Sequence, residues 1–184
     1  KEDFIAATMT TELTNTSELR EFVEELKRLK IEIVRPSINS CFAEFKAKNG
    51  KIFYGLGAIK NVGFEAISNI LIERENNGKF KSFTDFINRV DAKDVNKLQL
   101  EGLTKAGVFD ELIEDRAKIY NSIPKIIQKI KNINDDKTNN QSSLFGNSEN
   151  YENEFEFTSS SAWKQKEVLA EEFNSLGFYI SNHP

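Results

Sequence analysis

The chain has 184 residues and carries 25 lysines and arginines against 29 aspartates and glutamates, a formal net charge of −4. One cysteine, Cys41, and one histidine, His183, exclude an internal disulfide and argue against a cysteine metal cluster or a histidine-dependent catalytic centre. No apolar run approaches the ~20 residues of a membrane span, and the 15 phenylalanines suit a packed core. We therefore expect a soluble, folded, cytoplasmic protein.

The first predicted elements are a helix, a short strand and a hairpin. Apolar residues at helical spacing predict a helix over 17–30, capped by Ser17. Residues 31–34 predict a strand that stops before Pro36. Alternation over 43–47 and 51–54, with Asn49-Gly50 between, predicts a β-hairpin.

A glycine-rich loop over 54–63 follows, just before a predicted helix over 64–76 that Gly78 ends. A helix N-terminus presents free N–H groups and a partial positive charge, which suit a phosphate. We therefore expect phosphate contact by Lys60, Asn61 and Gly63, helped by backbone N–H groups near Val62 and Phe64. The alternative is a tight connector that only packs two helices. Lys60-Asn61 stands where Pro-Gly is common in such loops, which predicts a looser turn.

The next stretch predicts two helices and a second loop. Ser82 and Asp85 suggest a capped helix, and Asp94 is expected to cap another, with Val95, Leu98 and Leu103 inward and Gly107 at its end. The second loop covers 103–110. Lys105 and Gly107 are its candidates for DNA contact, but Asp110 would repel a phosphate, so a structural role stays open.

The last third alternates helix and linker. A long helix is expected from Asp115, kinked or restarted at Pro124. Polar and acidic residues over 132–161 predict a mobile linker. One segment inside that linker ends in an apolar pair: Gln141, Ser142, Ser143, Leu144 and Phe145. The pair Leu144 and Phe145 predicts either an anchor that fills a partner's pocket or a segment that folds back locally onto the module. A helix over 162–175, with Trp163 in packing, and a strand over 177–181 complete the chain.

The charge is distributed unevenly along the chain. Residues 46–131 hold 16 lysines and arginines against 11 acidic residues, whereas residues 135–161 hold one against six. The basic stretch contains both glycine loops, as phosphate binding requires. The pattern as a whole predicts a mainly α fold with a small β-hairpin and a tandem helix–hairpin–helix module.

Five segments, in order, resemble parts of the bacterial replicative DNA polymerase III alpha subunits, the C-family polymerases. Residues 54–63 are similar to the family's G-(I/L)-G-A-I-K-x-V-G loop and 103–110 to its L-x-x-x-G-x-F-D stretch. The other three segments are 6–10, 31–39 and 177–184.

This resemblance implies a fragment of a longer polypeptide. It assigns 1–45 to a helical remnant of the distal fingers, 46–134 to the tandem helix–hairpin–helix DNA-binding domain, and 135–161 to an acidic linker with a clamp-binding motif. Residues 162–184 would then lead into an absent oligonucleotide-binding-fold domain. The family's catalytic carboxylates lie upstream, so we expect no polymerase activity, metal or cofactor in this chain, although the parent polymerase is expected to use Mg²⁺.

The resemblance also implies partners. Residues 141–145 match the family's internal clamp-binding pentapeptide at Gln141, Leu144 and Phe145. The implied partners are double-stranded DNA, the sliding clamp (beta subunit) and other replicase subunits through the parent chain, with no membrane. The alternatives are an error-prone translesion polymerase, a repair or nuclease protein, and a structural spacer without DNA contact.

Overall fold

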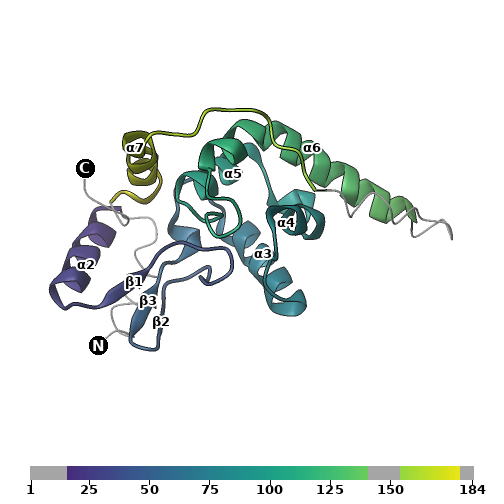
Figure 1. Cartoon of the computed structure of the whole chain (residues 1–184). Helices are drawn as coiled ribbons and strands as arrows, with labels where there is room; N and C mark the ends of the chain where they lie inside the picture. The colour runs from purple at the N-terminus through teal and green to yellow at the C-terminus, as the bar shows by residue number, and fades with distance from the viewer. Residues whose placement is uncertain (1–15, 141–153, 179–184) are drawn as a thin grey trace.

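The computed structural model describes residues 16–140 and 154–178, and this part of the chain is mainly helical with a small sheet, which confirms the predicted fold class (Figure 1). Helix α2 precedes the sheet, and a helical body follows it. The elements are α2 (Thr16–Arg28), β1 (Glu32–Val34), β2 (Lys46–Lys48), β3 (Lys51–Phe53), η1 (Leu56–Ala58), α3 (Phe64–Asn77), α4 (Phe83–Arg89), η2 (Ala92–Asp94), α5 (Lys97–Lys105), α6 (Arg116–Asn140) and α7 (Gln165–Leu176).

The sheet has three strands in the order β1-β3-β2. The predicted hairpin is confirmed: β2 and β3 are antiparallel, and Asn49 and Gly50 both take positive φ angles, 53° and 73°. The predicted strand at 31–34 is also present as β1. Its parallel pairing with β3, with Ile33 opposite Ile52, was not predicted. The sheet thereby delivers the chain to the first glycine loop.

The predicted boundaries of α3 and α4 are confirmed. Gly78, with φ 87°, ends α3, and the Ser82 side chain accepts a hydrogen bond from the Asp85 backbone N–H at the start of α4. The predictions for Asp94 and Leu98 were wrong. Asn96 caps α5, because its side chain accepts from the Gln99 N–H, and Leu98 is 57% exposed.

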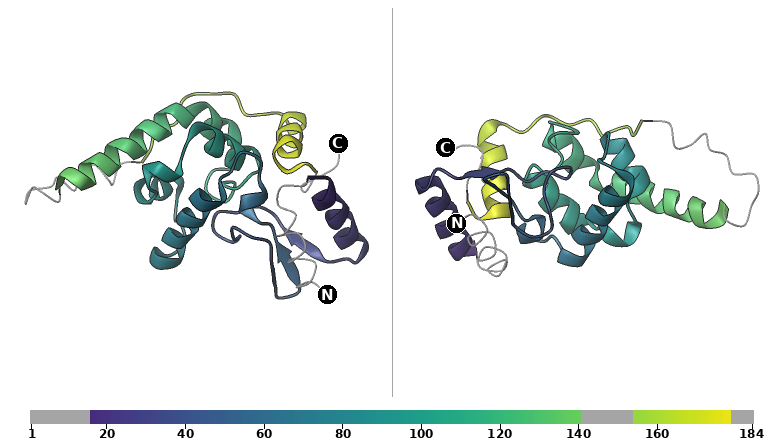
Figure 2. Two further views of the ribbon diagram at one scale, coloured as in Figure 1. Left: turned by 180° about the vertical axis from the view of Figure 1, so that it is seen from behind. Right: turned by 90° about the horizontal axis from the view of Figure 1, so that it is seen from below.

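Helix α6 begins where the sequence predicts, since Asp115 accepts from the Ala117 N–H. The sequence predicts a kink or a restart at Pro124; the helix is continuous through this residue, so the restart is wrong. The proline ring is exposed to solvent, and its missing N–H interrupts only one bond of the helix. Figures 1 and 2 show that α6 projects beyond the helical body, while α7 lies at the opposite end, near α2.

The expected linker is partly structured. Helix α6 continues to Asn140, past the predicted boundary at residue 134. Residues 154–163 then run back along α6: the Phe155 N–H donates to Thr84 Oγ1 at 3.0 Å and the Thr158 N–H to Ser122 Oγ at 2.8 Å. Phe157 packs 5.6 Å from the ring of Phe83. The hydrophobic periodicity of the sequence could not predict this packing of residues 154–163, because the contacts join segments far apart in sequence. Residues 141–145 lie outside the described residues.

Candidate nucleic-acid interface

The first hairpin connects η1 to α3 through a four-residue turn. The Val62 N–H donates to the Ile59 carbonyl oxygen at 3.1 Å, and Asn61 has φ 67°. Positive φ at this position is usual for glycine, and asparagine tolerates it better than most residues. The turn is therefore closed, contrary to the looser turn expected from Lys60-Asn61.

The exposed groups of this hairpin stand directly before the N-terminus of α3. Lys60, Asn61 and Gly63 are exposed, whereas the Val62 side chain is buried. The predicted N–H donor at Val62 is engaged within the turn, and the Gly63 N–H donates to Gln99 Oε1 at 3.3 Å. The first-turn N–H groups of α3 have no partner within the helix, so these remain the donors for an anion.

Elements distant in sequence fix the position of this hairpin. The Lys60 N–H donates to the carbonyl oxygen of Ser175 in α7 at 2.9 Å. Gly102 of α5 lies beneath the turn, where an added Cβ would stand 2.5 Å from the Lys60 carbonyl oxygen. The sequence did not single out Gly102 or Ser175, and no local pattern identifies them, because each acts through tertiary contact.

The second hairpin joins α5 to α6 and is covered. Lys105 Nζ lies 3.2 Å from Glu171 of α7, so its charge is already compensated. Gly107, with φ 79°, has the Arg116 guanidinium against its α-carbon, since an added Cβ would collide with Nη2. Phe109 is buried in the core. This geometry leaves little room for a phosphate.

Arg116 is the centre of a buried ionic cluster that attaches α7 to the second hairpin. Its side chain is 5% exposed and donates to both Asp110 oxygens, at 2.9 and 2.8 Å, and to Glu172 at 3.3 Å. Burial lowers the pKa of Arg116, but the two carboxylates more than offset that, so the pKa stands above its ordinary value. The guanidinium is therefore a permanent structural charge.

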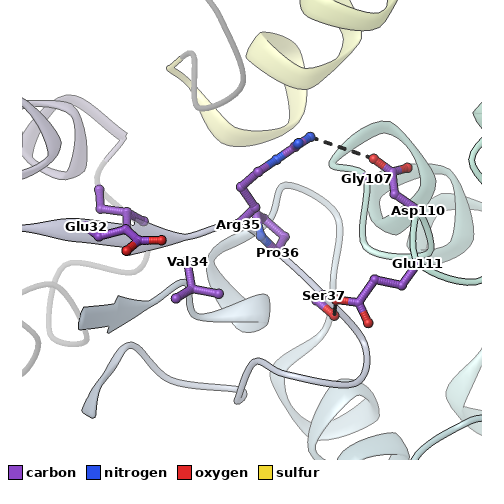
Figure 3. A pocket seen from close by; sticks show the side chains of 9 residues that line it. Glu32, Val34, Arg35, Pro36, Ser37, Gly107, Asp110 and Glu111 are labelled. Carbon is purple, nitrogen blue, oxygen red and sulfur yellow. Dashed lines mark hydrogen bonds and ion pairs between the residues drawn. The ribbon is translucent and has the colours of Figure 1, made fainter. Parts of the chain in front are cut away.

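A pocket beside this cluster lies between β1 and the second hairpin (Figure 3). Arg35 points to Asp110, with 3.7 Å between Nη2 and Oδ2, and Ser37 Oγ donates to Glu111 at 3.0 Å. Glu32 also lines the pocket. Because three carboxylates line it and its one arginine is paired, the pocket does not suit an anionic ligand.

Other candidate sites have structural explanations. Cys41 is buried, and burial raises the pKa of its thiol to about 11, so it is not a ready nucleophile. The Trp163 ring lies 5.4 Å from that of Tyr120, which fits the packing role expected of it. Within residues 16–140 and 154–178 no group of three or more His, Cys, Asp or Glu could hold a metal ion. No helix in the same residues is long and apolar enough to cross a membrane.

Comparisons with known proteins agree with this geometry. A family model described as a helix-hairpin-helix motif matches residues 30–119, which include both hairpins. The whole chain is 38% identical to a DNA polymerase III subunit alpha of Borreliella burgdorferi, and 99% of it is 35% identical to the one of Caulobacter vibrioides. The chain belongs to the DNA polymerase III alpha-subunit family. It corresponds to one segment of these proteins, since it covers 16% of the length of each.

Within the alpha-subunit family, the similarity extends beyond the two hairpins. The subunit alpha of Campylobacter jejuni is 36% identical over 99% of the chain. The matched length therefore includes α2, the sheet and α7 as well as the residues of the helix-hairpin-helix model. This extent supports reading α7, which contacts both hairpins, as an integral part of the module.

Proposed function

We propose that this chain is the part of a replicative DNA polymerase that holds duplex DNA through its first hairpin, without reading sequence. The observation that carries the proposal is the exposed Lys60-Asn61 turn directly before the N-terminus of α3, within the helix-hairpin-helix stretch. Among the described residues, no carboxylate forms an ion pair with Lys60, so its ammonium is available to a phosphate. Phosphate contacts position a protein on DNA but carry no base information.

The second hairpin has a structural role in this proposal. Its lysine is paired with Glu171 and its glycine is covered by Arg116. The competing reading, a spacer without DNA contact, draws support from Glu65, an acidic residue in the first turn of α3 that opposes an approaching phosphate. A binding measurement decides between the two.

Lys60→Gln and Gly63→Ala are each expected to weaken duplex binding several-fold, as measured by fluorescence anisotropy over a salt series. Lys60→Gln removes one phosphate contact, which should make the slope of log K against log salt shallower by about 0.9. Gly63→Ala places a methyl group at the helix N-terminus. Its Cβ meets nothing closer than Gln99 Oε1 at 3.6 Å, so the hairpin itself should be preserved.

Lys118→Gln is the matched control, because Lys118 is an exposed lysine on α6, away from the first hairpin. It should leave duplex affinity within twofold. If the unmodified chain shows no salt-dependent duplex binding, the chain is a spacer. If the control loses as much affinity as Lys60→Gln, the duplex is not held through the first hairpin.

We further propose that the segment 141–145 binds the sliding clamp of the replicase and tethers the polymerase to DNA. The support is the sequence of the segment, with Gln141 first and the apolar pair Leu144 and Phe145 last. Apolar anchors that fill a pocket commonly dominate peptide binding, and a tether raises effective concentration at the primer end. The parent protein is then a cytoplasmic, Mg²⁺-using DNA-directed DNA polymerase whose catalytic carboxylates lie outside this chain.

Replacing Leu144 and Phe145 together by alanine is expected to abolish binding of the chain to a bacterial beta clamp in surface plasmon resonance. The reason is the loss of both apolar anchors. A variant with Ser142→Ala and Ser143→Ala, at the permissive middle positions, should bind like the unmodified chain. Absence of clamp binding by the unmodified chain would identify the segment as ordinary linker.

A further inference from the structure

A basic hollow lies at the end of α3 opposite the first hairpin. It has a volume of about 610 Å³ and lies between β2, the loop at 39–42 and the C-terminal end of α3. Lys46, Lys48 and Lys79 line it together with the rings of Phe42 and Phe53. Because α3 has 14 residues, its two ends are about 21 Å apart. The hollow is therefore a separate surface from the first hairpin.

The lysines of the hollow pair with no carboxylate in the part of the chain that the structure describes. Elsewhere, Lys51 pairs with Glu32 and Lys105 with Glu171. Among the ion pairs of the described residues, none involves Lys46, Lys48 or Lys79. The carboxylate in the lining, Glu75, is held by the buried Arg74 at 3.0 Å. The hollow thus presents three uncompensated ammonium groups.

The walls of the hollow are fixed by hydrogen bonds. The Asn39 side chain donates to the Phe80 carbonyl oxygen and accepts from the Phe80 N–H, each at 2.9 Å, which fixes the backbone next to Lys79. Arg74 donates to the carbonyl oxygens of Ile38 at 2.9 Å and Cys41 at 2.6 Å. These bonds join α3 to the loop at 39–42. The backbone of these two walls is therefore held in place before a ligand arrives.

We propose that this hollow binds a single strand of DNA. Lys46 and Lys48 are two residues apart on β2, so their Cα atoms are about 7 Å apart and each ammonium can meet a different phosphate. Lys79 supplies a third contact from the other wall. Lysines around aromatic rings are the combination that single-strand sites use, because phosphates meet the cations while bases stack on the rings.

Phe53 is the stacking surface in this arrangement. The Lys46 ammonium lies 4.4 Å from the centre of the Phe42 ring and covers it. Phe53 is half-buried and meets Phe42 edge-on, with 5.8 Å between ring centres. A rigid duplex keeps its bases stacked inside and gains nothing from such a ring. The aromatic contact therefore favours a single strand.

The test compares fluorescein-labelled oligo(dT) and a blunt duplex in binding to the 184-residue chain, by anisotropy over a salt series. The variant carries Lys46→Gln, Lys48→Gln and Lys79→Gln. We expect its oligo(dT) affinity to fall at least tenfold and its salt slope to become shallower by about 2, since each single-strand phosphate contributes about 0.7. Phe53→Leu should weaken oligo(dT) binding several-fold without changing the slope.

The control carries Lys93→Gln, Lys118→Gln and Lys131→Gln, which removes the same charge from exposed lysines outside the hollow. It should bind oligo(dT) like the unmodified chain. Lys60→Gln separates this proposal from the duplex contact, because it should affect the duplex and spare oligo(dT). Equal oligo(dT) affinity for the hollow variant and the unmodified chain, or an equal loss in the control, overturns the proposal.

Discussion

Replacing Arg116 with leucine is expected to lower the free energy of unfolding by about 3–5 kcal/mol, the usual cost of removing one partner of a buried ion pair. Glu172 is 1% exposed and Arg116 is 5% exposed, so the change leaves a carboxylate in the protein interior without its cation. The same change removes the two hydrogen bonds that Asp110 accepts from Arg116 and leaves Asp110 with the Arg35 pair at 3.7 Å. Urea denaturation followed by circular dichroism measures the loss.

Two further variants test whether this loss of stability comes from the buried charge of Glu172 or from lost packing. Arg28→Leu breaks the exposed pair with Glu25 and should leave the urea midpoint nearly unchanged, because water and salt screen a pair at the surface. Adding Glu172→Leu to Arg116→Leu removes the buried carboxylate and should recover part of the stability. If the double variant is no more stable than Arg116→Leu, the buried Glu172 charge is not the source of the loss.

Replacing Gly102 with alanine is expected to lower the free energy of unfolding by about 1–3 kcal/mol, the range for overpacking a close contact. At an exposed position in a helix, the same change would stabilise by roughly 1 kcal/mol through helix propensity. Here the substitution destabilises the protein instead, because the added Cβ would stand 2.5 Å from the Lys60 carbonyl oxygen. This oxygen belongs to the backbone and cannot rotate away as a side chain can. Thermal and urea unfolding measure the difference.

The same substitution should also weaken duplex binding, because it pushes the Lys60 turn away from α5. Glu101→Ala is the control in the same helix; it removes a 3.9 Å pair with Lys97 without placing a Cβ against the Lys60 turn, and it should change both quantities less than Gly102→Ala does. An unchanged stability and DNA affinity in Gly102→Ala would mean that the hairpin moves without cost, and α5 would not be its support.

Local sequence determined most elements of this protein. Asn49-Gly50 specifies the hairpin, because both residues accept the positive φ angles of its turn. Ser82 and Asp115 start helices through side-chain bonds to residues only two or three positions ahead. The isoleucines of α6 lie on one face because the helical repeat puts them there; Ile119, Ile123, Ile126 and Ile130 are all buried. Such signals act within a few residues, so one sequence is enough to recognise them.

The tertiary structure decided what each hairpin can contact. Both loops have a lysine and a glycine before a helix, so from sequence alone we interpret them as two versions of one motif. In space, the carboxylates of α7 meet Lys105 and Arg116 of the second hairpin, whereas the Lys60 side chain of the first stays exposed. The α7 carboxylates that pair with Lys105 and Arg116 lie more than 50 residues away in the sequence. A local sequence pattern therefore cannot predict which lysine or arginine will be paired. Long-range packing therefore decides which hairpin keeps an exposed and uncompensated cation.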